Sequence, residues 1–467
     1  MSPSSVDATA AEVLARFTSS LEFEMIPTEQ ATSIEARVMD TLGVCVGGRN
    51  SDASVAVRRF ADEIGGNPQS QVVCEQTRLP SPSAALINGT YAHSLEFDDM
   101  HMPSVVHPSA PMVPAILAVA QASRSTGSQT IAALAAAYEI NVRLSLAQYD
   151  PELRNSVFFE NGLHATSIIG AVAGAAACAK LRRLDSEGIL HAISVACSMG
   201  AGLLEANRQG GSVKKMHGGW AAQSAVSAAA LAASGLTGPA TVLEGRFGFF
   251  QAYCRDRWRP AELTRDLGTT WHANKIHFKP YPCNFFTHTI ADAAIAMKRR
   301  GLKPEDVSQV VIKTALATWR TIGDPIEEKR NPKTPYHARF SAPFVFATAL
   351  LGGDGLGVGE SDFTEGRLAN AAVRRVMSVC EVVPDEECNR IFPEQAPAIV
   401  EVVTTGGARL KEKILVNRGG AERPLSLAEL RTKLNQTAGN LAPGIAQAVE
   451  TLRYSANVDE LMAATVE

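Results

Sequence analysis

The chain has 467 residues, of which 46% are apolar and 20% are charged, and its net charge is −4. This length exceeds the usual size of one hydrophobic core, so we expect two packed units, and the composition excludes a disordered chain. The net charge is small and no block of like charges occurs, so nothing indicates binding to nucleic acid or to an anionic membrane surface.

The eight cysteines are scattered, and no two of them form a Cys-x-x-Cys pair. Several lie in apolar runs such as 175–178, which favours buried free thiols in a reducing compartment. The first seven residues lack a basic region followed by an apolar core, so we expect no signal peptide. The longest apolar stretches, 168–179 and 225–233, are short and broken by glycine or serine, which argues against a membrane span and favours a cytoplasmic protein.

To about residue 270 the sequence predicts helices. The segments 130–148, 186–204 and 220–235 are rich in helix formers or carry apolar residues at helical spacing, and the last one ends at a glycine. Small residues dominate 170–177, and small side chains let helices approach each other closely. These features predict a tight helical bundle.

After about residue 275 the pattern changes to that of a smaller α+β unit. Residues 307–314 alternate and are β-branched, whereas 341–351 have a helical pattern. The stretches 398–405 and 408–414 flank Gly406-Gly407, which predicts a hairpin.

A helix is expected again near the end of the chain, because Ser426-Leu-Ala-Glu429 is a capping-box pattern. The tail is therefore expected to fold back onto the first helical part. The predicted fold is mainly α, with a large helical domain formed by residues 1–274 and 410–467. A smaller α+β domain, residues 275–409, is inserted before the C-terminal helices.

Titratable residues are concentrated between positions 96 and 107, where they include Glu96, Asp98, Asp99, His101 and His107. This polar density follows the apolar run 84–87 and suggests a loop that enters a helix at Ser109. Histidines titrate near neutral pH and carboxylates orient them, so general acid–base catalysis is one interpretation. A solvated loop with a helix cap at Ser109 is the other, and these residues alone leave both open.

Two further segments carry histidines. His164 stands at a predicted helix N-terminus, where the helix dipole favours anions and lowers the pKa of an imidazole; a capping or packing role is the alternative. Residues 210–220 hold Lys214, Lys215 and His217 among four glycines, just before a predicted helix. A flexible backbone with ammonium groups suits a substrate carboxylate, and an exposed loop with ordinary lysines is the alternative.

The α+β part opens with Lys279 between aromatic residues and prolines, which indicates a positioned side chain. Tyr336 and Arg339 lie close together in another short stretch, for which an exposed loop is the alternative. The chain contains no Gly-x-Gly-x-x-Gly after a strand, no Walker A sequence and no His-Glu-x-x-His, so no cofactor is expected. A metal site at His101, His107 and the nearby carboxylates is possible by ligand type, but acid–base catalysis explains the same residues without a metal.

The run 88–99, Asn-Gly-Thr-Tyr-Ala-His-Ser-Leu-Glu-Phe-Asp-Asp, followed by His107-Pro-Ser109, resembles the signature of the MmgE/PrpD family. That family includes 2-methylcitrate dehydratase, cis-aconitate decarboxylase and iminodisuccinate epimerase. Further matches are 162–167, 213–222 and 279–283. The resemblance implies a helical domain with an inserted α+β lid, a homodimer, and a small polycarboxylate as the substrate.

The resemblance also assigns site residues. It implies catalytic roles for Glu96, His107, His164 and Lys214 and a substrate contact for Lys279. We add as candidate substrate-binding residues Lys215, His217, His101, Tyr336 and Arg339. The chain departs from the decarboxylase pattern at positions that argue against cis-aconitate decarboxylation: Glu96 replaces Asp, Met100 replaces Thr, Asn284 replaces His and Phe344 replaces Tyr.

The members of the family share the formation or quenching of a carbanion next to a carboxylate. We hypothesise that Lys214 and Lys279 bind substrate carboxylates, while His107 or His164 transfers the proton. In this hypothesis Glu96 fixes the tautomer of an imidazole. We expect dehydration of a hydroxylated di- or tricarboxylate first, and epimerisation or decarboxylation next. A metal-dependent hydrolase and an inactive binding protein are the remaining alternatives.

Overall fold

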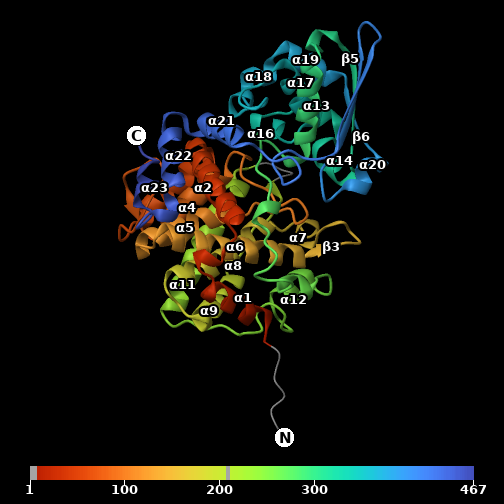
Figure 1. The fold of residues 1–467 in the computed structure, drawn as a ribbon. Helices are drawn as coiled ribbons and strands as arrows, with labels where there is room; N and C mark the ends of the chain where they lie inside the picture. The colour runs from red at the N-terminus through yellow and green to blue at the C-terminus, as the bar shows by residue number, and fades with distance from the viewer. Residues whose placement is uncertain (1–7, 207–210) are drawn as a thin grey trace. The chain divides into compact units, whose positions relative to one another are not determined.

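The computed structural model describes residues 8–206 and 211–467, which form two compact and mainly helical units (Figure 1). The first unit contains the described residues up to Ser94 together with Asp98–Ile276 and Ala438–Glu467. The second unit contains Leu95–Phe97 and His277–Thr437. None of the described helices combines the length and the apolar character that a membrane crossing requires.

The first unit is a bundle of helices joined by short connections. Its principal helices are α1 (Ala10–Ser20), α2 (Thr28–Gly48), α3 (Asp52–Ile64), α4 (Ser81–His93), α5 (Ser109–Ser123), α6 (Gly127–Ala147), α7 (Val157–Glu160), α8 (Ala165–Leu181), α9 (Ser186–Cys197), α11 (Val213–Ala233), α12 (Phe249–Cys254), α22 (Ala442–Glu450) and α23 (Asp459–Ala463). Two small hairpins interrupt them, one formed by β1 (Ser70–Gln71) and β2 (Arg78–Leu79), the other by β3 (Tyr149–Asp150) and β4 (Asn155–Ser156). The core of the bundle is formed by α4, α5, α8 and α11, which pack against one another.

Small residues let these central helices approach closely, as the sequence predicts. A Cβ atom on Gly174 of α8 would lie 2.8 Å from the Cβ atom of Ala225 of α11. A Cβ atom on Gly219 of α11 would lie 2.1 Å from a backbone carbonyl oxygen of α4. Both glycines are therefore required by the space between the helices.

The glycine-rich stretch 210–220 is not a loop. α11 begins at Val213 and continues through Gly218 and Gly219, while Gly210 lies outside the described residues. The prediction of a flexible loop is wrong because the close contact between α11 and α4 stabilises the helix and compensates for the low helix propensity of glycine. Only Ser212 and Gly211 precede the helix among the residues of this stretch that the structure describes.

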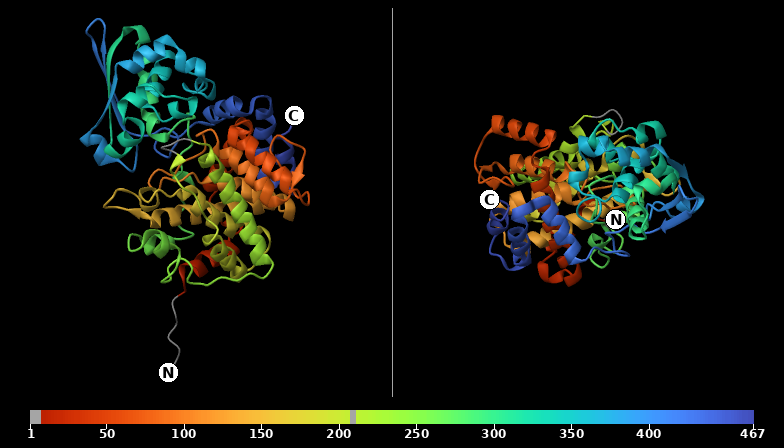
Figure 2. Two further views of the ribbon diagram at one scale, coloured as in Figure 1. Left: turned by 180° about the vertical axis from the view of Figure 1, so that it is seen from behind. Right: turned by 90° about the horizontal axis from the view of Figure 1, so that it is seen from above.

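The second unit contains a four-stranded sheet with strand order β6-β5-β7-β8. Its strands are β5 (Val307–Thr314), β6 (Cys380–Pro384), β7 (Ala398–Thr404) and β8 (Arg409–Ile414). Its helices include α13 (His288–Arg299), α14 (Leu316–Ile322), α15 (Ile326–Arg330), α16 (Pro335–Ala338), α17 (Ala342–Leu351), α18 (Glu365–Ala369), α19 (Ala371–Ser378), α20 (Glu386–Ile391) and α21 (Leu427–Ala438). Figures 1 and 2 show α13, α17 and α19 on one face of this sheet.

The local predictions for this unit are confirmed. β7 and β8 form the predicted antiparallel hairpin, with Val403 opposite Arg409, and Gly407 takes the left-handed conformation in its turn. The predicted capping box also forms at the start of α21: the Ser426 N–H donates to the Glu429 carboxylate at 2.8 Å, and the Glu429 N–H donates to the Ser426 hydroxyl at 3.3 Å.

The boundary predicted between residues 274 and 275 lies close to the observed one between Ile276 and His277, but the return to the first unit lies at a position that the sequence does not mark. Residues 410–437 cluster with the second unit, whereas the sequence predicts that the helical tail starts at residue 410. The reason is pairing within that unit: β8 bonds to β7, and the Asn417 N–H donates to the Gln395 side chain at 2.9 Å. From Ala438 onward the tail belongs to the first unit, where α22 packs against α2.

Candidate active site

Four histidines of the first unit form one buried group, which we call the imidazole cluster: His93, His107, His164 and His217. The ring centroids of His93 and His107 are 5.4 Å apart, and those of His93 and His164 are also 5.4 Å apart. The rings of His164 and His217 are 5.0 Å apart. Each ring lies at or near the end of a different central helix: α4, α5, α8 and α11.

Hydrogen bonds fix the proton positions on two of these rings. His93 Nδ1 lies 2.6 Å from Asp98 Oδ2, and His107 Nδ1 lies 2.8 Å from the backbone carbonyl oxygen of Asp99. A carbonyl oxygen only accepts, so His107 Nδ1 carries a proton and, in the neutral ring, Nε2 holds the lone pair. Asp98 Oδ2 also lies 3.6 Å from His107 Nδ1, so one carboxylate oxygen faces both imidazoles.

Asp99 holds the segment that precedes α5. Its carboxylate accepts from the Ser109 N–H at 3.0 Å and from the Ser109 hydroxyl at 2.5 Å, and it forms an ion pair with Arg37 at 3.0 Å. The first N–H group of α5 is thus satisfied by a carboxylate ten residues earlier. α5 begins at Ser109 as predicted, but the alternative of a solvated loop is wrong because Asp98, Asp99 and His107 are all buried.

The other two imidazoles bond to each other. His164 Nδ1 and His217 Nδ1 lie 2.9 Å apart, so one nitrogen donates and the other accepts. The donating ring therefore holds its lone pair on Nε2, and the accepting ring carries a proton on Nε2. Burial, together with the neighbouring imidazoles and Lys214, lowers the pKa of His217 to about 4 and holds the pKa of His164 well below its usual range. Both rings are neutral at neutral pH.

Two adjacent lysines of α11 have different surroundings. Lys214 is buried and lies one turn before His217 on the same face of the helix, and its charge contributes to the low pKa of His164 and His217. Lys215 forms an ion pair with Asp52 of α3 at 2.6 Å. The fold thus brings Lys214 to the imidazole cluster and directs Lys215 to α3.

In the second unit, three successive carbonyl groups of Leu95–Phe97 each accept a hydrogen bond from a cationic side chain. In chain order they accept from Arg339, Lys279 and Lys433, at 2.8, 3.1 and 2.8 Å, and we call these three side chains the cation cluster. Glu96 has a φ of +52°, in the left-handed region that costs energy for a residue with a side chain. The three hydrogen bonds therefore hold a backbone conformation that the residues would not adopt alone.

The Glu96 carboxylate lies among residues that the sequence singles out for substrate binding. Its Oε2 atom is 3.6 Å from Lys279 Nζ, and its Oε1 atom accepts from the Tyr336 hydroxyl at 3.2 Å. Arg339 also forms an ion pair with Glu360 at 2.5 Å. The second unit thus assembles four of the predicted residues around its Leu95–Phe97 segment, whereas the imidazoles gather in the first unit.

The remaining candidates have local partners. His101 Nδ1 lies 2.6 Å from the Ser104 hydroxyl oxygen. The Asn284 side chain accepts from a backbone N–H two residues later, at 3.0 Å, and so caps a short 3-10 helix. Phe344 is buried in α17 with its ring against that of Phe363.

His93 is a site residue that the sequence does not single out, although it lies within the recognised run 88–99. It contacts the rings of His107 and His164 and bonds to Asp98. Its Nε2 atom is buried and has no hydrogen-bond partner among the described residues. The sequence does contain one feature that could have indicated this role, which is the spacing of His93 and Asp98. His93 is the last residue of α4, and a carboxylate five residues later can reach its imidazole.

Among residues 8–206 and 211–467, no three or more histidine, cysteine, aspartate or glutamate side chains form a group that could hold a metal ion. The eight cysteines are free thiols, and all of them except the half-buried Cys74 are buried, as predicted.

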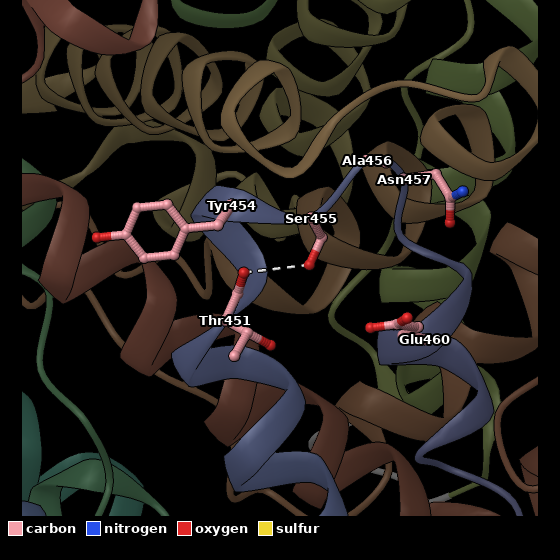
Figure 3. Close-up of a pocket in the computed structure, with 6 residues that line it drawn as sticks. All are labelled: Thr451, Tyr454, Ser455, Ala456, Asn457 and Glu460. Carbon is pink, nitrogen blue, oxygen red and sulfur yellow. Dashed lines mark hydrogen bonds between the residues drawn. The ribbon is translucent and has the colours of Figure 1, made fainter.

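A hollow of about 320 Å³ lies elsewhere in the first unit, on the C-terminal tail (Figure 3). Its lining consists of Thr451, Tyr454, Ser455, Ala456, Asn457 and Glu460. The Ser455 hydroxyl donates to the Thr451 carbonyl oxygen at 3.1 Å, the dashed line in Figure 3. This lining has one carboxylate and neither an imidazole nor a lysine, so it lacks the groups that bind an anion and transfer a proton near neutral pH.

The two units of the structure correspond closely to two domain models of one family. The model of the MmgE/PrpD N-terminal domain matches residues 12–261, and that of the MmgE/PrpD C-terminal domain matches residues 281–454. The chain therefore belongs to the MmgE/PrpD family, as its motifs indicate.

Two curated relatives are named cis-aconitate decarboxylase, and a third is named a cis-aconitate decarboxylase-like protein. The chain is 27% identical to cis-aconitate decarboxylase of Homo sapiens over 420 residues, which cover 86% of this chain and 82% of the relative. It is 24% identical to the cis-aconitate decarboxylase-like protein oryM of Aspergillus oryzae over 460 residues, covering 94% and 93%. It is 25% identical to cis-aconitate decarboxylase of Mus musculus over 425 residues, covering 86% and 81%. The family and these relatives support a lyase.

Proposed function

We propose that this protein is a lyase that acts on a small di- or tricarboxylate without a cofactor, by proton transfer at a carbon next to a carboxylate. Decarboxylation of a cis-aconitate-like acid becomes the first reaction to test, because two of the relatives are named cis-aconitate decarboxylase and the third is named a cis-aconitate decarboxylase-like protein. The sequence alone favours dehydration first. The observation that carries the proposal is the set of buried imidazoles whose proton positions follow from their hydrogen bonds.

The imidazole cluster offers both a proton acceptor and a proton donor. His107 holds its lone pair on Nε2, because its Nδ1 donates to the Asp99 carbonyl oxygen. In the pair formed by His164 and His217, the ring whose Nδ1 accepts carries its proton on Nε2. An acid and a base of this kind are what carbanion chemistry next to a carboxylate needs.

In a decarboxylation the bond between the substrate carbon and the departing carboxylate breaks, and carbon dioxide leaves. The electron pair stays on the substrate, whose remaining carboxylates carry the charge. The Nε2 lone pair of His107 accepts a proton from solvent, and His107 then donates that proton to the carbon. Lys214, buried beside these rings, supplies the positive charge that holds a substrate carboxylate and stabilises the carbanion.

Dehydration is the second candidate, because it uses the same groups in another order. His107 is the base and takes the proton from the carbon next to a substrate carboxylate. The hydroxyl group then receives a proton from the second imidazole and leaves as water. Asn284 and Phe344 favour this reaction, because they lack the imidazole and the phenol of the decarboxylase pattern. The chain does contain a phenol at another position, Tyr336, whose hydroxyl donates to the Glu96 carboxylate.

Two roles are open to the group formed by Lys279, Tyr336, Arg339 and Glu96. The first is to hold the Leu95–Phe97 segment, whose next residue, Asp98, bonds to His93. The second is direct binding of a substrate carboxylate by Lys279. That role requires the ammonium group, which is fully buried, to exchange the carbonyl oxygen of Glu96 for the substrate.

Proton NMR of the purified protein in deuterated water tests the proposal with a panel of acids: cis-aconitate, citrate-like hydroxy acids and succinate-like acids. Release of carbon dioxide with a deuteron in the product identifies a decarboxylase, and release of water identifies a dehydratase. Deuterium that enters the substrate without net conversion identifies an epimerase. An activity that a chelator abolishes supports a metal-dependent hydrolase instead, and no exchange with any acid of the panel overturns the proposal.

The matched control for histidine removal is His337→Gln, which replaces an exposed histidine of α16. This variant should turn over the same acids at the same rate as the unmodified protein. Its activity separates the loss of a particular imidazole from a general effect of replacing a histidine.

A further inference from the structure

We propose that His93 is a positioning residue that shares the Asp98 carboxylate with His107 and thereby sets how strongly His107 binds a proton. The proposal rests on the proposed function, in which His107 exchanges a proton with the substrate, and it adds a residue that neither the motif nor the relatives assign. His93 does not need to contact the substrate in this role. It acts through the carboxylate.

The Asp98 carboxylate lies near two imidazoles, and its distances from them differ. A single oxygen, Oδ2, lies 2.6 Å from His93 Nδ1 and 3.6 Å from His107 Nδ1. The shorter distance is a hydrogen bond, whereas the longer one is an attraction between charges without a hydrogen bond when His107 is protonated. His93 therefore holds the carboxylate at a distance from which it stabilises an imidazolium at His107 without pinning the proton there.

The unpartnered nitrogen of His93 supports a role beyond packing. Nε2 is buried and has no hydrogen-bond partner among the described residues, which costs stability. An apolar side chain of similar shape would fill the same space without that cost. The polar ring is therefore explained by its Nδ1–H, which is the group that bonds to Asp98.

Several charged or titratable groups of the described residues lie around His107. The packed elements contribute His93 from α4, Asp98 and Asp99 from the segment before α5, His164 from α8, Lys214 and His217 from α11, and Arg37 from α2. Arg37 is paired with Asp99, and Lys214 and a protonated neighbouring imidazole would disfavour a charge on His107. Asp98, whose Oδ2 atom lies 3.6 Å from His107 Nδ1, is thus a carboxylate that favours protonation of His107.

The test measures the pKa of His107 by NMR of histidine-labelled protein, with the resonance assigned by its loss in His107→Gln. Three variants are compared with the unmodified protein. His93→Leu removes the donor, so Asp98 turns wholly to His107, and the pKa of His107 should rise by about one unit. Asp98→Asn removes the charge, so the pKa should fall by about one unit. His93→Asn keeps an N–H at the position of Nδ1, so the pKa should stay near its original value.

Opposite shifts in His93→Leu and Asp98→Asn, with His93→Asn close to the unmodified protein, support the proposal. Shifts of equal sign, or no shift in Asp98→Asn, overturn it. If His93→Leu does not fold, His93→Phe takes its place, because it also removes the donor and fills the space of the ring, and the same rise in the pKa of His107 is expected. The NMR titration needs no turnover, so a chain that converts no acid in the panel but shows the opposite shifts refutes the proposed function and leaves the role of His93 supported.

Discussion

The short segment from His93 to Asp99 contributes to two clusters that use charge in opposite ways. In the imidazole cluster of the first unit, burial keeps His164 and His217 neutral, and hydrogen bonds decide which nitrogen carries each proton. In the cation cluster of the second unit, each positive charge binds a backbone carbonyl group of Leu95–Phe97. The first arrangement leaves protons that can move, whereas the second fixes a backbone conformation. Both clusters bury charged or titratable groups. Burial alone therefore does not show whether such a group transfers protons or stabilises a backbone conformation.

The largest expected effect is the loss of proton transfer in His107→Gln. Because His107 holds the lone pair that accepts the proton, its replacement should lower kcat/KM by about 10²–10⁴-fold. The thermal midpoint should change little, since glutamine can still donate to a carbonyl oxygen. Retention of full activity in a folded variant would remove His107 from the mechanism.

The adjacent lysines of α11 provide a matched pair. Lys214→Gln should lower kcat/KM by about 10²-fold, because Lys214 lies beside the imidazoles. A loss of this size is typical when one group that stabilises the charge of the transition state is removed. Lys215→Gln should leave kcat/KM nearly unchanged, because Lys215 is paired with Asp52. Equal losses in steady-state assays of the two variants would contradict this difference between neighbours.

The low pKa of His217 predicts an acid-sensitive fold. An unfolded histidine takes up its proton near pH 6.5, but native His217 does so only near pH 4. The folded state is therefore favoured fully above pH 6.5 and loses stability as the pH falls toward 4, by up to about 3 kcal/mol. Urea unfolding of the unmodified protein and of His217→Gln checks this, because the difference between them should shrink across that window. A difference that is independent of pH would show that His217 titrates normally.

The smallest effect concerns the cation cluster. Lys433→Met keeps the apolar stem but leaves the buried carbonyl group of Phe97 without its charged donor, which should lower the free energy of unfolding by about 2 kcal/mol. Lys411→Met, on the exposed edge strand β8, is the control and should have no measurable effect. If Lys433→Met is as stable as this control, the cation does not hold the segment.

The local elements of the fold follow from the sequence. The predicted helix 130–148 corresponds to α6, and the predicted hairpin corresponds to β7 and β8, since each depends on patterns within a few residues. The start of α11 and the boundary at residue 437 depend on contacts between distant residues. Gly219 is tolerated in a helix only because α4 lies against it, and no local propensity reports that contact.

For the candidate site too, the sequence predicts which residues take part but not which residues they contact. His107, His164 and Lys214 stand in recognisable motifs, and the fold brings His164 and Lys214 to the imidazole cluster that contains His107. The partner of each side chain was not predictable. Glu96 was expected to orient an imidazole, but its carboxylate lies beside Lys279 and Tyr336, and Asp98 bonds to His93. Such choices depend on the backbone conformation of single residues, including the left-handed conformation of Glu96, which no local sequence pattern reports.

In the proposed reaction, the imidazole cluster transfers a proton to or from a carbon next to a carboxylate. The most direct measurement is the deuterium content of the product formed in deuterated water. For decarboxylation of a cis-aconitate-like acid, we predict one deuteron on carbon in each product molecule, formed at a rate that falls by about 10²-fold or more in His107→Gln. A product without deuterium on carbon, or an unchanged rate in that variant, would contradict the account.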